Sequence, residues 1–511
     1  MRPPDQKEIQ AKRLFITRTL AVLVFVLVAM TAILLRLYWL QIQHHDHYKT
    51  LATDNRIKLL PLPPARGEIY DRNGVVLAKN ITSVDLFITP DQVDDIPAVI
   101  AELQEIVTIT EEDIQRFGKL RRRLRRFEQV PIRTGLTDEE MAQFAVERHR
   151  FRGVDLGVNL RRYYPFGELT AHVVGYIGRI NERELERIDK AAYAGTSHIG
   201  KTGLERFYEE QLHGDVGVQR VEIDAMGHII RILETQPPVT GEDIQLHFDI
   251  ELQKIAFEAL GEHAGSVVVI DVKTGGVLAM ASKPSFDANL FVNGISFKDY
   301  NALRDDSGNP LFNRAINGSY PPGSTVKPFI GLAGLETQTV NHVQSIYCPG
   351  HYRIKNAGRT FRDWKRTGHG TIDLEKSIEQ SCDVYYYDLA YSMGIDKMHD
   401  YLAQFHFGKQ TGIDMPAETS AVLPSQEWKK RRYKQSWLPG DTVNAGIGQG
   451  YFLVSPVQLA YATAVLAADG KLIHPRLASR IGKQSALSPG AEMESIHKKD
   501  PQNWEHVIDG M

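Results

Sequence analysis

An uncharged apolar run near the N-terminus constrains this chain more than any other feature. From Thr19 to Leu35 the sequence reads TLAVLVFVLVAMTAILL, and Arg36 is followed by LYWL. This stretch approaches the about 20 residues that a helix needs to cross a bilayer. A cleaved signal peptide is the alternative, but the apolar core is long for one and no A-x-A-like cleavage site follows it. We therefore expect a transmembrane helix over residues 19–40.

Basic residues gather on the N-terminal side of this run. They are Arg2, Lys7, Lys12, Arg13 and Arg18, against the acidic Asp5 and Glu8. Since positive charge is retained on the cytoplasmic side of a span, residues 1–18 are predicted to form a cytoplasmic tail. The sequence holds no second run of this kind, so a single-pass protein with its bulk outside the cytoplasm is expected.

The composition beyond the span is that of a globular protein. Of the 511 residues, 42% are hydrophobic and 24% are charged, which is enough for a packed core. The net charge of −3 excludes a chain-wide polycation, so nucleic acid is not expected as a partner. Two cysteines exclude a disulfide scaffold but allow one disulfide or one metal site.

The texture of the sequence changes several times after the span. Residues 41–65 end in PLPP and predict an extended stalk, because proline favours extended backbone. RGEIYDRNGVVLA predicts two strands around an Asn73-Gly74 turn, and residues 96–150 are charged with helical periodicity. Within them, KLRRRLRRF (119–127) is interpreted as a solvated helix face, with contact to anionic lipid or polymer as the alternative. Past residue 240, VVVIDV, GGVLAMAS and long helical patterns predict an α/β or α+β catalytic domain.

A serine and a lysine three residues apart are the first candidates for chemistry. In NRAINGSYPPGSTVKPF (313–329), Ser324 and Lys327 would share one face of a helix. Gly323 would permit the tight turn before this helix, and Pro328 would fall in its first turn, where a missing N–H costs little. A lysine can take the proton of a serine hydroxyl when burial and nearby positive charge lower its pKa. We predict Ser324 as nucleophile and Lys327 as its base.

A second candidate lies in EQSCDVYYYDLA. Ser381 and Asp383 form an S-x-D triplet at the start of a helical pattern. The serine would relay a proton between Lys327 and a leaving amine, and the acid would hold the two lysines of such a site in place. The alternative is a helix N-cap, a position that Ser and Asp commonly fill.

One match to a phosphate-binding motif is interpreted as coincidental. GTSHIGKT (195–202) fits the pattern of a phosphate-binding loop, which requires a buried strand directly before it. Here the charged helical pattern NERELERIDKAAYA precedes it, so we expect no nucleotide as a partner.

Taken together, these motifs resemble the class B penicillin-binding proteins, a family of serine-active transpeptidases. The resemblance covers nearly the whole chain, and the wording of PLPPARGEIYDRNG and YPPGSTVKP is most similar to the penicillin-binding protein 2 subfamily of the elongation machinery. It implies an α+β protein: a transmembrane helix, an elongated, dimerisation-like pedestal (41–235, with the helical part at about 96–150), and a serine β-lactamase-like α/β transpeptidase domain (240–511). The segments that carry it are RGEIYDRNG (66–74), RRYYPFG (161–167), GKTGLE (200–205), PSFDAN (284–289), NRAINGSYPPGSTVKP and GIGQGYFLVSPVQLA (446–460).

The resemblance also implies an activity, a location and partners. The substrate would be the peptidoglycan stem peptide ending in D-Ala-D-Ala, as for a serine-type D-Ala-D-Ala transpeptidase or carboxypeptidase. Ser324 would form an acyl-enzyme, expel D-Ala and pass the acyl group to an amine on a neighbouring strand, and β-lactams would inhibit the reaction. The protein would sit in the bacterial inner membrane with its bulk in the periplasm. It would act beside a polytopic SEDS-type glycan polymerase and other proteins of the elongation complex.

The third motif of the family, K-[ST]-G, does not follow the S-x-D triplet. K-T-G occurs only upstream, at 201–203 and at 273–275, where the second copy predicts a hairpin turn. Because relatives are expected to continue for roughly a hundred residues past Met511, we expect a truncated sequence whose transpeptidase domain lacks its C-terminal part. A non-catalytic, membrane-anchored scaffold for a glycan polymerase is therefore the alternative function.

Four potential metal ligands lie between residues 348 and 382: Cys348, Asp363, His369 and Cys382. Thiolate, imidazole and carboxylate are zinc ligands, and four of them describe a closed structural site. The resemblance implies Zn²⁺ here, because some members of the subfamily carry it and three of the residues fit their spacing, whereas an aspartate is expected in place of Cys348. A disulfide and two unlinked thiols are the alternatives.

Overall fold

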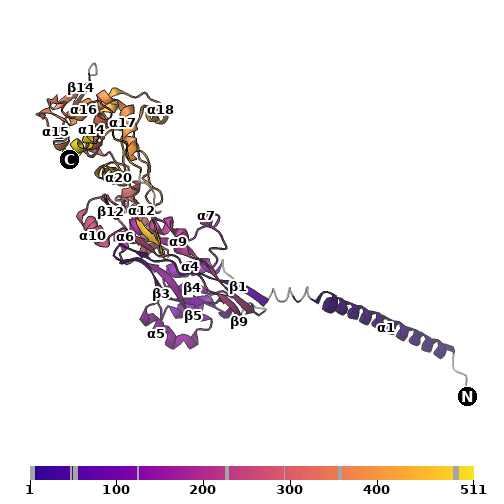
Figure 1. The fold of residues 1–511 in the computed structure, drawn as a ribbon. Helices are drawn as coiled ribbons and strands as arrows, with labels where there is room; N and C mark the ends of the chain where they lie inside the picture. The colour runs from indigo at the N-terminus through magenta and orange to yellow at the C-terminus, as the bar shows by residue number, and fades with distance from the viewer. Residues whose placement is uncertain are drawn as a thin grey trace. The chain divides into compact units, whose positions relative to one another are not determined.

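The computed structural model describes residues 6–45, 49, 56–122, 126–224, 229–292, 294–354, 359–486 and 494–511. The chain forms two compact units, Met1–Leu62 with Gly217–Pro237, and Pro63–Val216 with Pro238–Met511. Figure 1 traces their helices and strands. Residues 123–125 of the basic run lie outside the described residues, so the interpretation of that run as a helix face stays a prediction.

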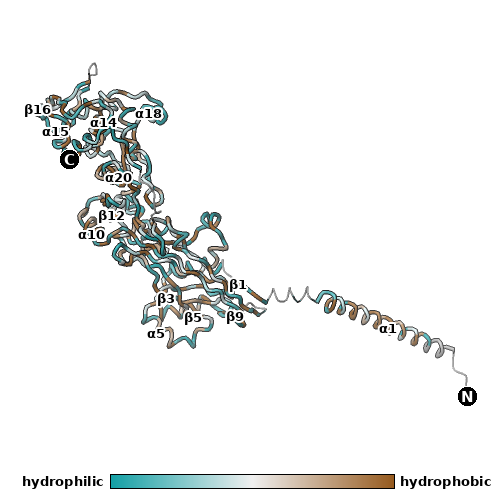
Figure 2. The backbone as a smooth tube through the Cα atoms, in the orientation of Figure 1, coloured by the Kyte–Doolittle hydropathy of each residue, from teal (hydrophilic) through white to brown (hydrophobic). Residues whose placement is uncertain are grey.

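The smaller unit contains the apolar helix. Helix α1 (Gln6–Tyr38) continues as a π-helical turn, η1 (Trp39–Gln43). Residues Arg13–Gln43 are the single segment in the described part of the chain that is long and apolar enough to cross a membrane, and Figure 2 shows mostly hydrophobic residues along α1. The guanidinium of Arg36 lies 4.5 Å from the ring centroid of Trp39. The predicted span is therefore a helix that extends beyond residues 19–40 at both ends.

The same unit holds a three-stranded antiparallel sheet. Its strands are β1 (Ile57–Leu62), β8 (Gly217–Ile223) and β9 (Ile229–Gln236), in the order β1-β8-β9. The predicted stalk thus ends in a paired strand. Pro61 is tolerated there because β1 lies at the sheet edge, where strand prolines are usually found.

The larger unit is built on a seven-stranded sheet. Its strands are β2 (Ile69–Tyr70), β3 (Val76–Ile88), β4 (Val130–Arg133), β5 (Val154–Tyr163), β10 (Ile244–Leu246), β17 (Ala478–Ile481) and β18 (Gln484–Ser485). The order is β18-β17-β10-β2-β3-β4, and β5 also pairs with β3. The predicted Asn73-Gly74 turn is confirmed, since β2 and β3 pair in antiparallel fashion around it. Strands from both sides of residue 240 share this sheet.

The charged region after this hairpin is helical, as predicted, but it also contributes β4. Its helices are α3 (Ile96–Leu103), α4 (Glu111–Arg121) and α5 (Asp138–Glu147). Each begins at a residue whose side chain caps a backbone N–H: Asp95, Thr110 and Thr137. Their apolar faces bury a small core with the sheet.

Residues 240–511, the predicted catalytic half, combine a hairpin with a helical core. Strands β11 (Gly265–Ile270) and β12 (Val277–Lys283) pair in antiparallel fashion, so the predicted turn at Lys273-Thr274-Gly275 is confirmed. Helix α14 (Lys327–Glu336) is buried along its whole length. Around it pack α15 (Leu374–Glu379), α16 (Asp383–Met393), α17 (Ile395–Leu402) and α21 (Gln502–Asp509), of which α16 and α17 are labelled beside it in Figure 1.

The other elements connect these parts. They are η2 (Pro90–Gln92), η3 (Arg148–Arg150), α6 (Gly167–Val174), β6 (Ile177–Arg179), α7 (Glu182–Leu185), β7 (His198–Gly200), α8 (Gly203–Phe207), α9 (Glu209–His213), α10 (Ile250–Ala259), α11 (Asn289–Val292), α12 (Phe297–Asp305), α13 (Arg314–Asn317), η4 (Gly323–Val326), β13 (Ile346–Cys348), β14 (His351–Arg353), β15 (Thr360–Arg362), β16 (Gly370–Ile372), η5 (Ala403–Phe405), α18 (Gln426–Tyr433), α19 (Pro439–Ala445) and α20 (Pro456–Ala467).

One buried carboxylate joins three segments of residues 41–235, the predicted pedestal half. Glu205 is fully buried and accepts hydrogen bonds from Arg66 Nε (2.6 Å), Arg162 Nε (2.7 Å) and the Tyr164 hydroxyl (3.2 Å). Burial alone would raise the pKa of Glu205, but the charges of Arg162 and Arg66 hold it below its usual value. The segments RGEIYDRNG, RRYYPFG and GKTGLE therefore converge on one ion-pair network.

We predict that Glu205→Gln lowers the free energy of unfolding by about 3–5 kcal/mol, because the buried Arg162 guanidinium loses its counter-charge and Arg66 keeps only Glu209. Urea unfolding measures the loss. Because the folded-state pKa of Glu205 is depressed, its contribution is full above the unfolded pKa and is lost as the pH falls through the folded value. The matched control is Asp155→Asn, whose partner Arg148 is 66% exposed, with an expected cost below about 1 kcal/mol. Equal losses in the two variants would contradict the prediction.

Candidate active site and metal centre

The predicted nucleophile lies on a tight turn at the start of the central helix. Turn η4 runs directly into α14, and the backbone N–H of Lys327 donates to the carbonyl of Ser324. Ser324 is exposed, whereas Lys327 is only 1% exposed. Pro328 occupies the first turn of α14, as predicted. The structure thus places the serine at the surface, one helical turn before a buried lysine.

The lysine amine is held by the S-x-D triplet. Lys327 Nζ lies 2.7 Å from Asp383 Oδ1, 2.8 Å from the carbonyl oxygen of Ser381 and 3.2 Å from Ser381 Oγ. The N-cap of α16 is Cys382, so Ser381 does not cap that helix. The ring of Tyr386 lies below the amine, with its centroid 5.4 Å from Nζ. The structure therefore brings Lys327, Ser381 and Asp383 together as one group.

The backbone of the S-x-D turn is itself unusual. Ser381 has φ +53°, a left-handed conformation that few non-glycine residues adopt. Its carbonyl also accepts a hydrogen bond from the indole nitrogen of Trp364 (3.1 Å), and the backbone N–H of Trp364 donates to Asp383 Oδ2 (3.2 Å). The unfavourable backbone conformation of Ser381 is thus held in place by two donors to its carbonyl, Lys327 and Trp364.

Two residues that hold this site were not predicted. Trp364 is one, and Gly448 in the GIGQG segment is the other. The backbone N–H of Gly323 donates to the carbonyl of Gly448 (2.9 Å), and Gly448 has φ +68°. A Cβ on Gly448 would lie 2.3 Å from the carbonyl oxygen of Gly323, so only glycine fits. The dense glycines of GIGQGYF were the signal for such a close backbone approach.

The four potential metal ligands meet next to this turn. Their ligand atoms all lie within 4.8 Å of one another. Cys348 Sγ is 3.6 Å from both Asp363 Oδ2 and His369 Nδ1, and Cys382 Sγ is 3.4 Å from Asp363 Oδ2. Both cysteines are free thiols. The cluster is attached to the S-x-D turn, because Cys382 directly precedes Asp383 and the backbone N–H of Val384 donates to Asp363 (3.1 Å).

The chemistry of the cluster fits a zinc ion. The side chains of Asp363 and His369 are 0% and 1% exposed, and both cysteines are buried. Burial raises the pKa of Asp363, but backbone N–H groups of Lys365 and Val384 hold it below its usual value, so a charged oxygen faces the two sulfurs. Two sulfurs, one nitrogen and one oxygen within reach of one point match a tetrahedral zinc site.

Neither of the two upstream K-T-G triplets takes the place of the third family motif beside Ser324. Lys273-Thr274-Gly275 forms the β11–β12 turn. In the second triplet, Lys201 forms an ion pair with Glu184, and Gly203 begins α8.

An exposed serine beside a buried lysine that an S-x-D turn holds, on a helical core next to an antiparallel hairpin, defines a serine acyl-transferase of the penicillin-binding class. The family models agree: the penicillin-binding protein dimerisation domain matches residues 61–246, and the penicillin-binding protein transpeptidase domain matches residues 265–510. The chain belongs to the penicillin-binding proteins.

The most informative similarities are to penicillin-binding protein 2. The peptidoglycan D,D-transpeptidase MrdA of Acinetobacter baumannii is 44% identical over 468 residues, which are 92% of this chain and 70% of the relative. The structure of Pseudomonas aeruginosa PBP2 in complex with WCK 5153 has a TM-score of 0.68 at 39% identity, covering 89% of this chain and 80% of that one. The complex between PBP2 and MreC from Helicobacter pylori has a TM-score of 0.77 at 30% identity, covering 89% and 84%.

We predict that Gly448→Ala slows acylation of Ser324 by about 10²-fold, because the added Cβ displaces the Gly323 backbone and with it the nucleophile. A time course of labelling with fluorescent penicillin, quenched at intervals, measures the acylation rate. The control is Gly412→Ala, which has a similar positive φ of +79° but no atom within 4 Å of the new Cβ. It should lose some stability and keep its acylation rate. A Gly448→Ala rate equal to that of this control would show that the glycine contact does not position Ser324.

Proposed function

We propose that this chain is a peptidoglycan D,D-transpeptidase that cross-links stem peptides through an acyl-enzyme on Ser324. The observation that carries the proposal is the buried Lys327 amine, held by Ser381 and Asp383 one helical turn after the exposed serine. The 44% identity to the A. baumannii transpeptidase supports it.

In the first half-reaction, Ser324 Oγ attacks the carbonyl carbon of the penultimate D-Ala, and Lys327 Nζ takes the hydroxyl proton. The tetrahedral intermediate then collapses and the peptide C–N bond breaks. The departing D-Ala amine receives the proton from Lys327 through Ser381 Oγ, which lies 3.2 Å from Nζ. Asp383 keeps the lysine in position in both of its charge states.

In the second half-reaction, an amine from a neighbouring strand attacks the ester carbonyl of the acyl-enzyme. It gives up its proton along the same route, the ester C–O bond breaks, and Ser324 Oγ recovers its proton. The enzyme is then restored, and the cross-link is a new amide bond.

The apolar helix α1 supports a location at a membrane. We place α1 across the inner membrane of a bacterium, with residues 1–18 in the cytoplasm because of their positive charge and the catalytic half in the periplasm, where peptidoglycan lies. We infer that glycan polymerisation falls to a separate membrane protein, because neither matched domain is a polymerase. A partner like MreC, with which the H. pylori relative forms a complex, fits the same elongation role.

Zinc belongs to this proposal as a structural ion. Cys348, Asp363, His369 and Cys382 would hold it, and the ion would supply a rigid link between the loop that carries Trp364 and the start of α16. Through this link the cluster would fix the carbonyl of Ser381 and the carboxylate of Asp383 against Lys327.

We predict that Ser324→Ala abolishes covalent labelling by fluorescent penicillin, because the attacking oxygen is removed. Lys327→Ala should slow labelling by about 10²–10⁴-fold, the usual contribution of a positioned base. The control is Ser345→Ala, an exposed serine outside the site. Labelling that survives in Ser324→Ala would refute the assignment. A folded wild-type chain that is not labelled at all would favour the non-catalytic scaffold.

We predict that the purified protein contains about one zinc per chain, measured by elemental analysis, and that His369→Ala loses it. The matched control is His351→Ala, an exposed histidine in the same region, which should retain the metal. Zinc loss should also slow labelling of Ser324, because the S-x-D turn loses its anchor. A metal-free wild-type protein, or equal zinc in both variants, would end the proposal.

A further inference from the structure

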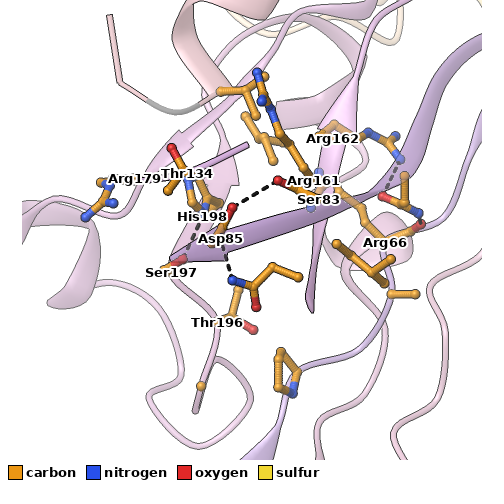
Figure 3. A pocket seen from close by; sticks show the side chains of 18 of the residues that line it. Arg66, Ser83, Asp85, Thr134, Arg161, Arg162, Arg179, Thr196, Ser197 and His198 are labelled. Carbon is orange, nitrogen blue, oxygen red and sulfur yellow. Dashed lines mark hydrogen bonds between the residues drawn. The ribbon is translucent and has the colours of Figure 1, made fainter. Parts of the chain in front are cut away.

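A polar cavity lies in the pedestal half, among residues that the proposed chemistry does not use. Its volume is about 480 Å³, and it is lined by residues of β3, β5, β6 and β7 and their neighbours (Figure 3). Small-molecule sites commonly measure about 300–1,000 Å³. The cavity is therefore large enough for a small ligand.

The lining of this cavity is strongly cationic. Five arginines line it, namely Arg66, Arg116, Arg161, Arg162 and Arg179, against one acidic residue, Asp85. The carboxylate of Asp85 is already occupied. Its Oδ1 accepts from the hydroxyl of Ser83 (3.0 Å) and the backbone N–H of Gly135 (2.9 Å), and its Oδ2 accepts from Asn159 (2.8 Å). The Asp85 carboxylate is thus occupied by these three hydrogen bonds, of which the one from Ser83 can be followed in Figure 3.

The acids that hold some of these arginines are not among the lining residues. Glu205 binds both Arg66 and Arg162, and Asp113 binds Arg116. Arg162 is 3% exposed, and its Nη2 is buried without a hydrogen-bond partner among the described residues. A buried donor of a charged group is costly without an acceptor, and the described residues provide none for this nitrogen.

Arg179, at the end of β6, is a second cation of this lining, and part of its side chain is exposed. In the described part of the chain it forms no ion pair, and its pKa is lowered, first by burial and then by the like charge of Arg116. Next to it, burial and the charge of Arg179 lower the pKa of His198 to about 4, so this ring is neutral at pH 7. Its Nδ1 lies 2.8 Å from the hydroxyl of Ser197 (Figure 3). Among the described residues, no carboxylate forms an ion pair with Arg179.

We propose that this cavity binds a small polar ligand that carries an oxyanion, either a carboxylate or a phosphate. Arg179 and the free Nη2 of Arg162 would bind the oxyanion, because a planar guanidinium matches the geometry of both groups. The hydroxyl groups of Ser83, Thr134 and Ser197 line the same space and suit the neutral polar part of the ligand, such as sugar hydroxyls or peptide amides.

Two sources of such an oxyanion are distinguished by experiment. The first probe is a disaccharide-tetrapeptide wall fragment, a choice that rests on the proposed function; it lacks the terminal D-Ala-D-Ala bond and cannot acylate Ser324. The second probe is the same fragment with its carboxylates amidated, and the third is inorganic phosphate. Calorimetric titration of the full chain in detergent micelles measures binding of each.

The charged fragment, inorganic phosphate or both should bind saturably, and the amidated fragment should not. Arg179→Gln should weaken binding by about tenfold to a hundredfold, the loss expected for one charged hydrogen bond. Arg148→Gln, which changes an exposed arginine paired with Asp155, should leave it unchanged. Binding of the charged fragment alone identifies a carboxylate ligand, and binding of phosphate alone identifies a phosphate ligand.

A second measurement needs no variant. A bound oxyanion should raise the pKa of His198 above about 4 in the wild-type chain. An NMR titration of the His198 ring protons, with and without the anion, measures this pKa. The proposal is overturned if neither anion binds saturably, if Arg179→Gln binds as tightly as wild type, or if the pKa of His198 does not move. Labelling of Ser324 by fluorescent penicillin in the same samples is a separate readout, so failure of the proposed function and failure of this proposal are distinguishable.

Discussion

The burial of one lysine amine organises the catalytic half of this protein. Lys327 is 1% exposed at the start of a fully buried helix, a position that is costly for an amine without hydrogen-bond partners. Asp383 and the carbonyl of Ser381 supply the partners, and both belong to one turn at the start of α16. Helices α14 and α16 must therefore meet at this end, and Ser324 is presented at the surface as a consequence.

The turn that supplies these partners depends in turn on its surroundings. A left-handed serine is unfavourable by itself, so Ser381 keeps this conformation only where neighbours determine it. Trp364 bonds both the Ser381 carbonyl and the Asp383 carboxylate, and Asp363 bonds the backbone of Val384. The cluster of two cysteines, an aspartate and a histidine is thus built into the support of the lysine, which gives a physical reason for a structural ion at this distance from the nucleophile.

Local features of the site could be predicted from the sequence because they depend on neighbours in the chain. The spacing of Ser324 and Lys327 places them on one helical turn whatever the rest of the fold, and Asn73-Gly74 specifies a hairpin turn by its own backbone preference. Contacts between distant segments could not be predicted in this way. Nothing near Gly448 indicates that its carbonyl meets Gly323, and nothing near β17 indicates that it pairs with β10. The resemblance to the family located GIGQG as a motif without saying what it contacts.

The network around Glu205 shows why stability and ligand binding in the pedestal half must be tested at different residues. Arg162 serves both: its Nε binds the buried carboxylate, while its Nη2 lacks a partner in the part of the chain that the structure describes. A change at Arg162 would remove a buried counter-charge, and any effect on the cavity would be hidden by the loss of stability. Arg179 forms no ion pair with an acid within that part of the chain. Burial and the neighbouring charge of Arg116 already disfavour the charged form of Arg179. Neutralising Arg179 should therefore leave the fold intact or stabilise it slightly. Two neighbouring cations such as Arg179 and Arg116 repel each other, and such an arrangement is expected where a protein binds an anion.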